Sequence, residues 1–214
     1  MRENPDNLLA GPDAAKALIR ENPWATMASA TPAGVVVSHY PFLLEEPADG
    51  GDDIVLVSHV GRPDERLHRL GESELCVVFY GPNGYVSPSW YGLPTAVPTW
   101  NFATVHAYGI PEILSDDENL AVLERLVDHF EDPLPNPFRM RGTLENAAYA
   151  ERIVHGTVGF RMRVTRFEGK NKMSQDKSPE VVDRIVAALR APGPYSNAGL
   201  ADTIDASRPS EPVE

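Results

Sequence analysis

Residues 85–109 read YVSPSWYGLPTAVPTWNFATVHAYG, and the rest of the chain is best interpreted outward from them. This stretch holds two of the three tryptophans, Trp90 and Trp100, among small hydroxyl residues, prolines and an asparagine. Large rigid rings beside hydrogen-bonding side chains suit a flat heteroaromatic molecule, because the rings exclude water and the polar groups fix its orientation. The same composition also fits a proline-bounded hairpin whose aromatic side chains belong to the core.

Around this stretch, the sequence predicts short strands separated by turns. The clearest strand alternates apolar residues from Val158 to Val164 with Gly159, Arg161, Arg163 and Thr165, so that one face is buried and the other is charged. Proline and glycine predict turns at 31–34 and 81–84. Strands are expected over residues 25–30, 35–44, 54–58, 75–80, 85–87, 99–114 and 158–164.

Helices are expected between the strands and at the end of the chain. Ser115 and Glu118 have the spacing of a capping box, which predicts a helix start. The apolar spacing predicts inward-facing Leu67 and Leu70 in one helix, and an inward stripe of Leu120, Leu123, Val127 and Phe130 in another. The six expected helices cover residues 13–21, 63–70, 116–130, 143–153, 178–189 and 197–204. Six or seven short strands with helices inserted late fit a closed or split barrel better than a parallel sheet.

Length and composition fit one domain. A chain of 214 residues with 42% hydrophobic content can bury one substantial core. We expect a single domain over residues 1–206 and a flexible, proline-rich tail over residues 207–214. No apolar run is long enough to cross a bilayer, and the amino terminus lacks the pattern of a secretory signal. The sequence therefore predicts a soluble, cytoplasmic protein with no membrane partner.

Two sequence blocks resemble the PaiB family. Residues 85–91 and 97–109 are similar to the family signature, and residues 172–178, KMSQDKS, are similar to its Lys-Leu-Ser-Gln-Asn block. Weaker similarity extends from residues 22–26 to residues 197–201, so the likeness covers nearly the whole chain. The resemblance implies a mainly β (α+β) fold, an FMN-binding split β-barrel with peripheral helices. It also implies a homodimer and a family usually described as transcriptional regulators.

The resemblance further implies which residues contact FMN. In split-barrel flavoproteins, basic and hydroxyl residues in the turn after a central strand hold the phosphate, and the ring lies in a groove between two subunits. The phosphate contacts expected on this basis are Ser58, His59 and Arg62, with Lys172 and Ser174 from the second block. Two of the four residues Trp90, Thr99, Trp100 and Asn101 are expected to contact the ring or the ribityl chain, and the others to belong to the core or the dimer interface.

One segment departs from the family pattern. PaiB-like chains usually carry an Ala-Asn-Pro-like run after the histidine, whereas this chain has Gly61-Arg62-Pro63-Asp64. Arginine remains a suitable phosphate ligand, because its planar guanidinium can grip a phosphate at two points. The departure leaves open whether the chain retains FMN.

The formal net charge of −12 bears on DNA binding. DNA-binding proteins normally present a basic face, because neutralising phosphates supplies most of the non-specific affinity. Residues 161–177 offer a local patch with six basic and two acidic residues. This patch suits DNA, a cofactor phosphate or simply the solvated face of a strand.

Three functions remain open from the sequence. The first is a PaiB-like, FMN-binding transcriptional regulator. The second is an FMN-dependent reductase or oxygenase acting on a small-molecule substrate, with catalytic residues that the sequence does not identify. The third is a split-barrel scaffold without flavin. The six histidines lack metal-ligand spacing, so no metal site is predicted, and no motif points to haem.

Overall fold

The structure is a computed structural model that describes residues 4–46 and 53–208. Within these residues the chain forms two compact units, each described on its own. Unit 1 comprises residues 4–18, 80–105 and 168–208, and unit 2 comprises residues 19–46, 53–79 and 106–167. The single domain expected over residues 1–206 stays a prediction, and most of the expected flexible tail lies outside the described residues.

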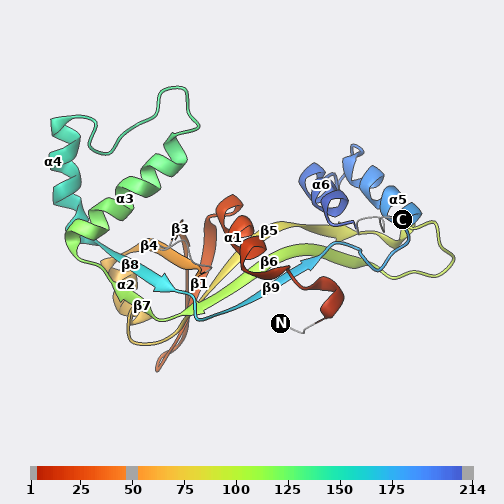
Figure 1. Cartoon of the computed structure of the whole chain (residues 1–214), viewed down its shortest axis with the longest axis horizontal. Helices are drawn as coiled ribbons and strands as arrows, with labels where there is room; N and C mark the ends of the chain where they lie inside the picture. Colours follow the sequence, from red (N-terminus) through yellow and green to blue (C-terminus); the bar gives the residue numbers. More distant parts are fainter. Residues whose placement is uncertain (1–3, 47–52, 209–214) are drawn as a thin grey trace. The chain divides into compact units, whose positions relative to one another are not determined.

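Nine strands in the described part of the chain form two sheets, ordered β2-β1-β5-β6-β9 and β3-β4-β8-β7 (Figure 1). β1 pairs antiparallel with β2 and β5, and β8 pairs antiparallel with β4 and β7. β9 was not predicted from the sequence, because its polar residues show no apolar alternation. The strands are β1 (Trp24–Thr31), β2 (Gly34–Pro41), β3 (Leu43–Glu45), β4 (Val55–Gly61), β5 (Leu75–Val86), β6 (Thr99–Gly109), β7 (Pro111–Ile113), β8 (Thr157–Arg163) and β9 (Arg166–Lys172).

The six expected helices are confirmed, and each end falls within two residues of its predicted position. Ser115 and Glu118 form both halves of the expected capping box at the start of α3. The α-helices are α1 (Gly11–Glu21), α2 (Arg62–His68), α3 (Asp116–Glu131), α4 (Leu144–Ile153), α5 (Pro179–Arg190) and α6 (Ala198–Ala206). Three short 3-10 helices are η1 (Pro5–Asn7), η2 (Pro88–Trp90) and η3 (Val154–Gly156).

The core of unit 2 is organised around Phe42. This residue is fully buried and stands alone between β2 and β3, where the chain leaves one sheet and enters the other. Its ring makes edge contacts with Phe79 in β5 and Phe160 in β8, at centroid distances of 5.9 and 5.8 Å. The single strand expected over residues 35–44 is therefore wrong, because the chain turns a corner at Phe42.

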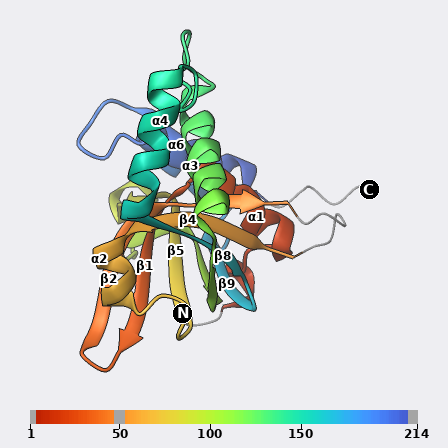
Figure 2. The same ribbon diagram turned by 90° about the vertical axis from the view of Figure 1, so that its left-hand side faces the viewer.

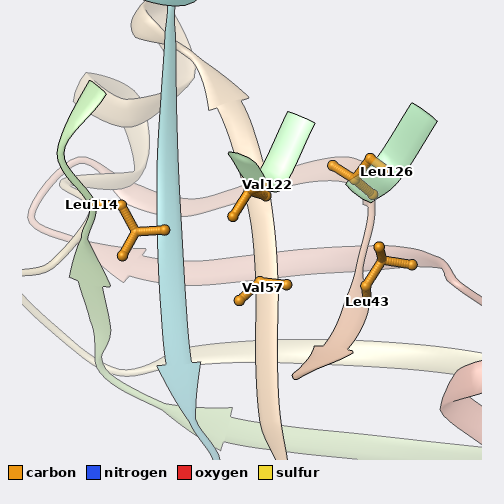
Figure 3. Packing of buried hydrophobic residues seen from close by; sticks show 5 residues of the cluster. All are labelled: Leu43, Val57, Leu114, Val122 and Leu126. Atoms are coloured by element: carbon orange, nitrogen blue, oxygen red, sulfur yellow. The ribbon is translucent and has the colours of Figure 1, made fainter. Parts of the chain in front are cut away.

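α3 packs on the four-stranded sheet through a compact apolar cluster. Val122 and Leu126 of α3 lie against Leu43 and Val57 of the sheet and against Leu114 (Figure 3). α3 and α4 lie on the same side of this sheet (Figure 2).

The inward stripe expected for α3 is wrong. The buried side chains are Asn119, Val122 and Leu126, whereas Phe130 is half exposed. The Asn119 amide explains the rotation, because it donates to the Thr157 hydroxyl at 3.0 Å. A Cβ at Gly159 would also lie 2.7 Å from the Asn119 Oδ1 atom, so the glycine lets this face of α3 approach the strand.

Unit 1 contains the outer parts of β5 and β6 together with α5 and α6. The turn expected at residues 81–84 is wrong, because β5 continues through it. Close packing explains why glycines occur there. A Cβ at Gly81 would lie 3.1 Å from the Ala103 Cβ atom, and one at Gly84 would lie 2.9 Å from a Leu200 methyl group. The expected apolar stripe of α5 is confirmed, with Ile185 and Leu189 fully buried.

α2 is held in unit 2 by a polar network rather than by the expected leucine pair. Leu70 is buried as expected, but Leu67 is 58% exposed and His68 is only 1% exposed. The His68 ring nitrogens bond to the Ser29 hydroxyl at 2.8 Å and to the Ser38 hydroxyl at 3.0 Å. These bonds turn the His68 side of α2 toward β1 and β2.

The network continues to the start of α2. Ser38 and Tyr40 donate to the Asp64 carboxylate at 3.2 and 2.5 Å, and the Gly61 amide donates to the Tyr40 hydroxyl at 3.3 Å. Asp64 thus fixes the junction of β4 and α2, where Arg62 lies.

The free energy of unfolding is predicted to decrease as the pH falls below about 6.5, the usual pKa of histidine. Burial lowers the pKa of His68 from the usual 6.5, against an opposing effect of Asp64, and burial also lowers the pKa of His59. The unfolded chain therefore binds protons first, so the free energy of unfolding is intact above about pH 6.5 and falls as the pH drops toward the folded-state pKa values. Urea denaturation at several pH values measures this loss.

A His68→Gln variant separates the contribution of His68. We expect it to lower the free energy of unfolding near neutral pH by about 1–3 kcal/mol, because it leaves buried hydroxyls unpaired. The variant should also lose less stability than the wild type on acidification. His129→Gln, at an exposed position of α3, is the control. Parallel pH profiles for wild type and His68→Gln would contradict the assignment.

Candidate functional site

Four of the nine residues expected to contact FMN converge on one pocket of unit 1. The pocket has a volume of about 370 Å³. Its walls come from the loop after η2, from the start of β6 and from the segment after β9. The lining residues are Tyr91, Leu93, Thr95, Ala96, Val97, Pro98, Thr99, Asn101, Lys172, Ser174, Asp176 and Lys177.

Direct hydrogen bonds join the two sequence blocks in this pocket. The Asn101 amide nitrogen donates to the Ser174 hydroxyl at 2.8 Å, and both side chains are buried. The Lys172 ammonium donates to the Thr99 hydroxyl. Residues more than 70 positions apart in sequence thus form one polar surface.

The turn after β9 has a shape set by its own side chains. Ser174 adopts a left-handed backbone conformation with φ of 64°. Gln175 holds this turn, because its side-chain oxygen accepts from the Met173 amide at 2.7 Å and its nitrogen donates to the Asn171 carbonyl at 2.6 Å. The Ser-Gln pair of the second block therefore places the Ser174 hydroxyl beside Asn101.

Two lining side chains have a buried polar atom without a partner. Among the described residues, four buried side-chain polar atoms lack a hydrogen bond, and two of them are the Tyr91 hydroxyl and the Asn101 Oδ1 atom. Such atoms are uncommon in native proteins, because each loses its hydration without gaining a bond. Their presence in one pocket wall fits a polar ligand that supplies the missing partners.

The charges in the pocket favour an anion. Lys172 and Lys177 provide two ammonium groups, and Asp176, which pairs with Lys177, provides one carboxylate. Burial raises the pKa of the Tyr91 hydroxyl, with Lys177 acting in the opposite direction. Tyr91 therefore remains a neutral hydroxyl that can donate a hydrogen bond.

Neither tryptophan predicted from the sequence lines this pocket. Trp100 alternates with Thr99 and Asn101 along β6, and its ring is 52% exposed. It donates to the Asn83 side chain at 3.3 Å and makes an edge contact with Tyr85. Trp90 ends η2 and is half-buried.

The other three predicted residues lie in unit 2, with Ser58 and His59 within β4 and Arg62 at the first position of α2. Ser58 is fully buried and donates to the Pro41 carbonyl at 2.7 Å. Arg62 donates to the His155 carbonyl at 3.0 Å, and its guanidinium lies 3.5 Å from Glu65 and 3.8 Å from Asp116. The His59 Nδ1 atom is buried and has no partner. Of the three side chains, His59 therefore has a buried polar atom that lacks a hydrogen-bond partner.

The basic patch expected at residues 161–177 is largely neutralised at its first three arginines. Arg161 pairs with Glu45, Arg163 with Asp53, and Arg166 with Glu74 at 3.4 Å. The Arg161 guanidinium lowers the pKa of Glu45, which keeps that carboxylate charged. These arginines carry no surplus positive charge that would attract DNA.

Residues 4–46 and 53–208 contain neither a metal-binding cluster nor a membrane-spanning helix. No group of three or more His, Cys, Asp or Glu side chains in this range is arranged to hold a metal ion. No helix in it has both the length and the apolar character needed to cross a membrane.

Comparisons with known proteins agree with the fold and with the family resemblance. A family model described as "Putative FMN-binding domain" matches residues 4–166. The protease synthase and sporulation protein PAI 2 of Bacillus subtilis is 28% identical over 80% of this chain and 81% of its own length. Protein YKL070W of Saccharomyces cerevisiae is 34% identical over 52% of this chain and 69% of its own length.

A solved structure shows the same fold. The FAD and heme binding protein from Mycobacterium smegmatis superimposes with a TM-score of 0.58 at 17% sequence identity, over 83% of this chain and 79% of that one. The expected α+β split barrel with peripheral helices is confirmed. The PaiB-like resemblance and the FMN cofactor class are likewise supported by the family match. This chain belongs to the FMN-binding domain family, as a PaiB-like member with a split-barrel fold.

Proposed function

We propose that the unit 1 pocket holds FMN in this PaiB-like flavoprotein. One observation carries the proposal: two separate sequence blocks meet in a pocket that contains two buried polar atoms without partners. The volume of about 370 Å³ lies within the usual range for small-ligand pockets, roughly 300–1,000 Å³. When bound, FMN supplies a redox-active ring that side chains cannot replace.

Each part of the pocket has a role suited to this ligand. Lys172 and Lys177 offer positive charge to the phosphate, and the Thr99 hydroxyl, which is bonded to Lys172, offers it a hydrogen bond. The Ser174 hydroxyl, which is bonded to Asn101, holds that side chain at the ring end of the ligand. The apolar wall from Leu93 to Pro98 offers contact to a flat ring.

Within unit 2, the end of β4 and the start of α2 are a separate candidate for phosphate binding. Its support is the His59 Nδ1 atom, which lacks a partner, and the Arg62 guanidinium, which faces carboxylates only at 3.5 and 3.8 Å. Such long, partly exposed ion pairs contribute little, so Arg62 can exchange them for a phosphate. Ser58 supports this part of β4 through the Pro41 carbonyl.

FMN titration of the purified protein tests the pocket. We expect FMN fluorescence or absorbance to change on binding. Lys172→Ala should weaken binding about tenfold or more, because charge-assisted hydrogen bonds to a phosphate are the stronger kind. Arg152→Ala, at an exposed position in the last turn of α4, serves as a control for the loss of one positive charge. Equal affinity for wild type and Lys172→Ala would remove Lys172 from the site.

Arg62→Ala tests this candidate separately. Weaker FMN binding is expected if the guanidinium contacts the phosphate, and unchanged affinity would exclude Arg62 from the site. The riboflavin affinity of each variant identifies the contacted group, because riboflavin lacks the phosphate. A true phosphate contact weakens FMN binding and spares riboflavin binding.

We also propose a homodimer formed through the open face of β1 and β2. Val35 and Val37 alternate on β2 and are 74% and 53% exposed, and Trp24 on β1 is 62% exposed. Trp24 stacks on the His39 ring at 6.4 Å, which extends the same face. Contiguous exposed apolar side chains are typical of an interface.

Introducing charge on this face tests the dimer. Val35→Lys with Val37→Lys should halve the mass measured by light scattering, because two charged side chains oppose burial. Leu144→Lys, at a position of α4 that is 92% exposed, should leave the mass unchanged. A wild-type protein that is monomeric at micromolar concentration would refute the proposal.

The proposed biological role is PaiB-like regulation of transcription. It is supported by the family and by the similarity to the B. subtilis sporulation protein. Direct DNA contact through residues 161–166 finds no support, since these arginines pair with carboxylates.

A flavin-dependent reductase or oxygenase acting on a small molecule is the second candidate. The spacing of α3 and α4 supports this enzyme candidate. Residues 132–143 separate the two helices, whereas the helices of a DNA-binding helix-turn-helix are joined by a turn of three or four residues. The cytoplasmic location remains a prediction from the sequence.

Selection of genomic DNA fragments tests the regulatory role. An operator-binding protein should enrich one sequence and retain it at about 0.15 M salt, where weak phosphate contacts no longer suffice. Binding that lacks sequence preference and disappears on salt addition would contradict direct operator recognition. Steady NADH or NADPH oxidation by the same sample would then favour the enzyme.

A further inference from the structure

We infer that Tyr91 and Asn101 recognise the imide edge of the flavin ring, where a ring N–H lies between two carbonyl groups. The inference rests on the proposed FMN function and adds a specificity role for each residue. Asn101 would accept a hydrogen bond from the ring N–H, and Tyr91 would donate one to a neighbouring carbonyl.

The open atom of Asn101 defines what its partner must be. Its amide nitrogen is committed to the Ser174 hydroxyl at 2.8 Å, and its Oδ1 atom is buried without a partner. An amide oxygen only accepts hydrogen bonds, so the missing group is a donor. A phosphate that is fully ionised has no donor and does not fill this position.

Tyr91 can supply the complementary group, a hydrogen-bond donor. Its hydroxyl is buried without a partner, and the residue is 3% exposed. Its backbone is fixed, because its carbonyl accepts from the Arg184 guanidinium at 2.6 Å and its amide donates to the Pro88 carbonyl at 3.1 Å. A neutral hydroxyl can both donate and accept, and a carbonyl group of the ligand would satisfy it as an acceptor.

A ligand that carries a donor and an acceptor would satisfy both residues. An imide edge presents both on a rigid ring. The neighbouring wall residues Leu93, Ala96, Val97 and Pro98 are apolar and suit the faces of such a ring. Ribityl hydroxyls also donate and accept, but ordering a flexible chain costs conformational entropy that a rigid edge does not lose.

Methylation of the ring N–H gives a direct test on the full-length protein. FMN and its N3-methyl derivative are titrated by flavin fluorescence. We expect the methyl derivative to bind the wild type about tenfold or more weakly, the loss of one good buried hydrogen bond. Asn101→Leu should bind both ligands with the same affinity, because the acceptor is absent. Equal affinities for the wild type would overturn the inference, while FMN binding itself would stand.

Tyr91→Phe tests the second residue with two readouts. We expect FMN binding to weaken about tenfold, while the melting temperature without flavin stays equal or rises, because an unpaired buried hydroxyl has been removed. A lower melting temperature with unchanged FMN affinity would show a purely structural role and refute the assignment. Tyr149→Phe, which alters a half-exposed tyrosine of α4, should change neither value.

The outcomes separate this inference from the proposed function. If neither ligand binds the wild type, the proposed FMN site fails. If FMN binds and Lys172→Ala weakens it, but methylation and Tyr91→Phe have no effect, the site stands and the imide assignment fails.

Discussion

The corner at Phe42 is the constraint on which unit 2 depends. A single buried residue joins β2 of one sheet to β3 of the other, and its ring contacts Phe79 and Phe160, one from each sheet. The two sheets must therefore face each other around this ring. Removing a fully buried phenylalanine typically costs about 3–5 kcal/mol, a large part of the stability of a domain. His59 lies in β4, a strand of this core, and Arg62 begins α2 directly after that strand.

Local signals predicted the helices well and the corners poorly. The capping box at Ser115 and the apolar stripe of α5 are encoded within a few residues, so the sequence is sufficient for them. The corner at Phe42 depends on rings from distant strands, and β5 continues through Gly81 because another strand packs closely against it. The rotation of α3 depends on one buried asparagine, Asn119, which periodicity treats as polar and therefore exposed.

The candidate site could be predicted only in part from the sequence. Thr99, Asn101, Lys172 and Ser174 came from the family resemblance, and the pocket brings them together. Trp100 separates from them because neighbouring residues of a strand point to opposite faces, a rule that the sequence itself contains. Tyr91 was missed, since only its burial without a hydrogen-bond partner distinguishes it from other tyrosines. That property exists only once the chain is folded.

The unpaired polar atoms also bear on whether flavin has been lost. His59, Tyr91 and Asn101 each keep a buried atom without a partner, and each such atom costs about 1–3 kcal/mol of stability. A scaffold without a ligand would gain stability from apolar replacements at these positions. A flavoprotein recovers part of that loss when the ligand binds, because a ligand that binds only the folded state stabilises it. Asn119 has a fourth such atom and a structural role, so the support for a bound ligand comes from Tyr91 and Asn101, which line the same pocket.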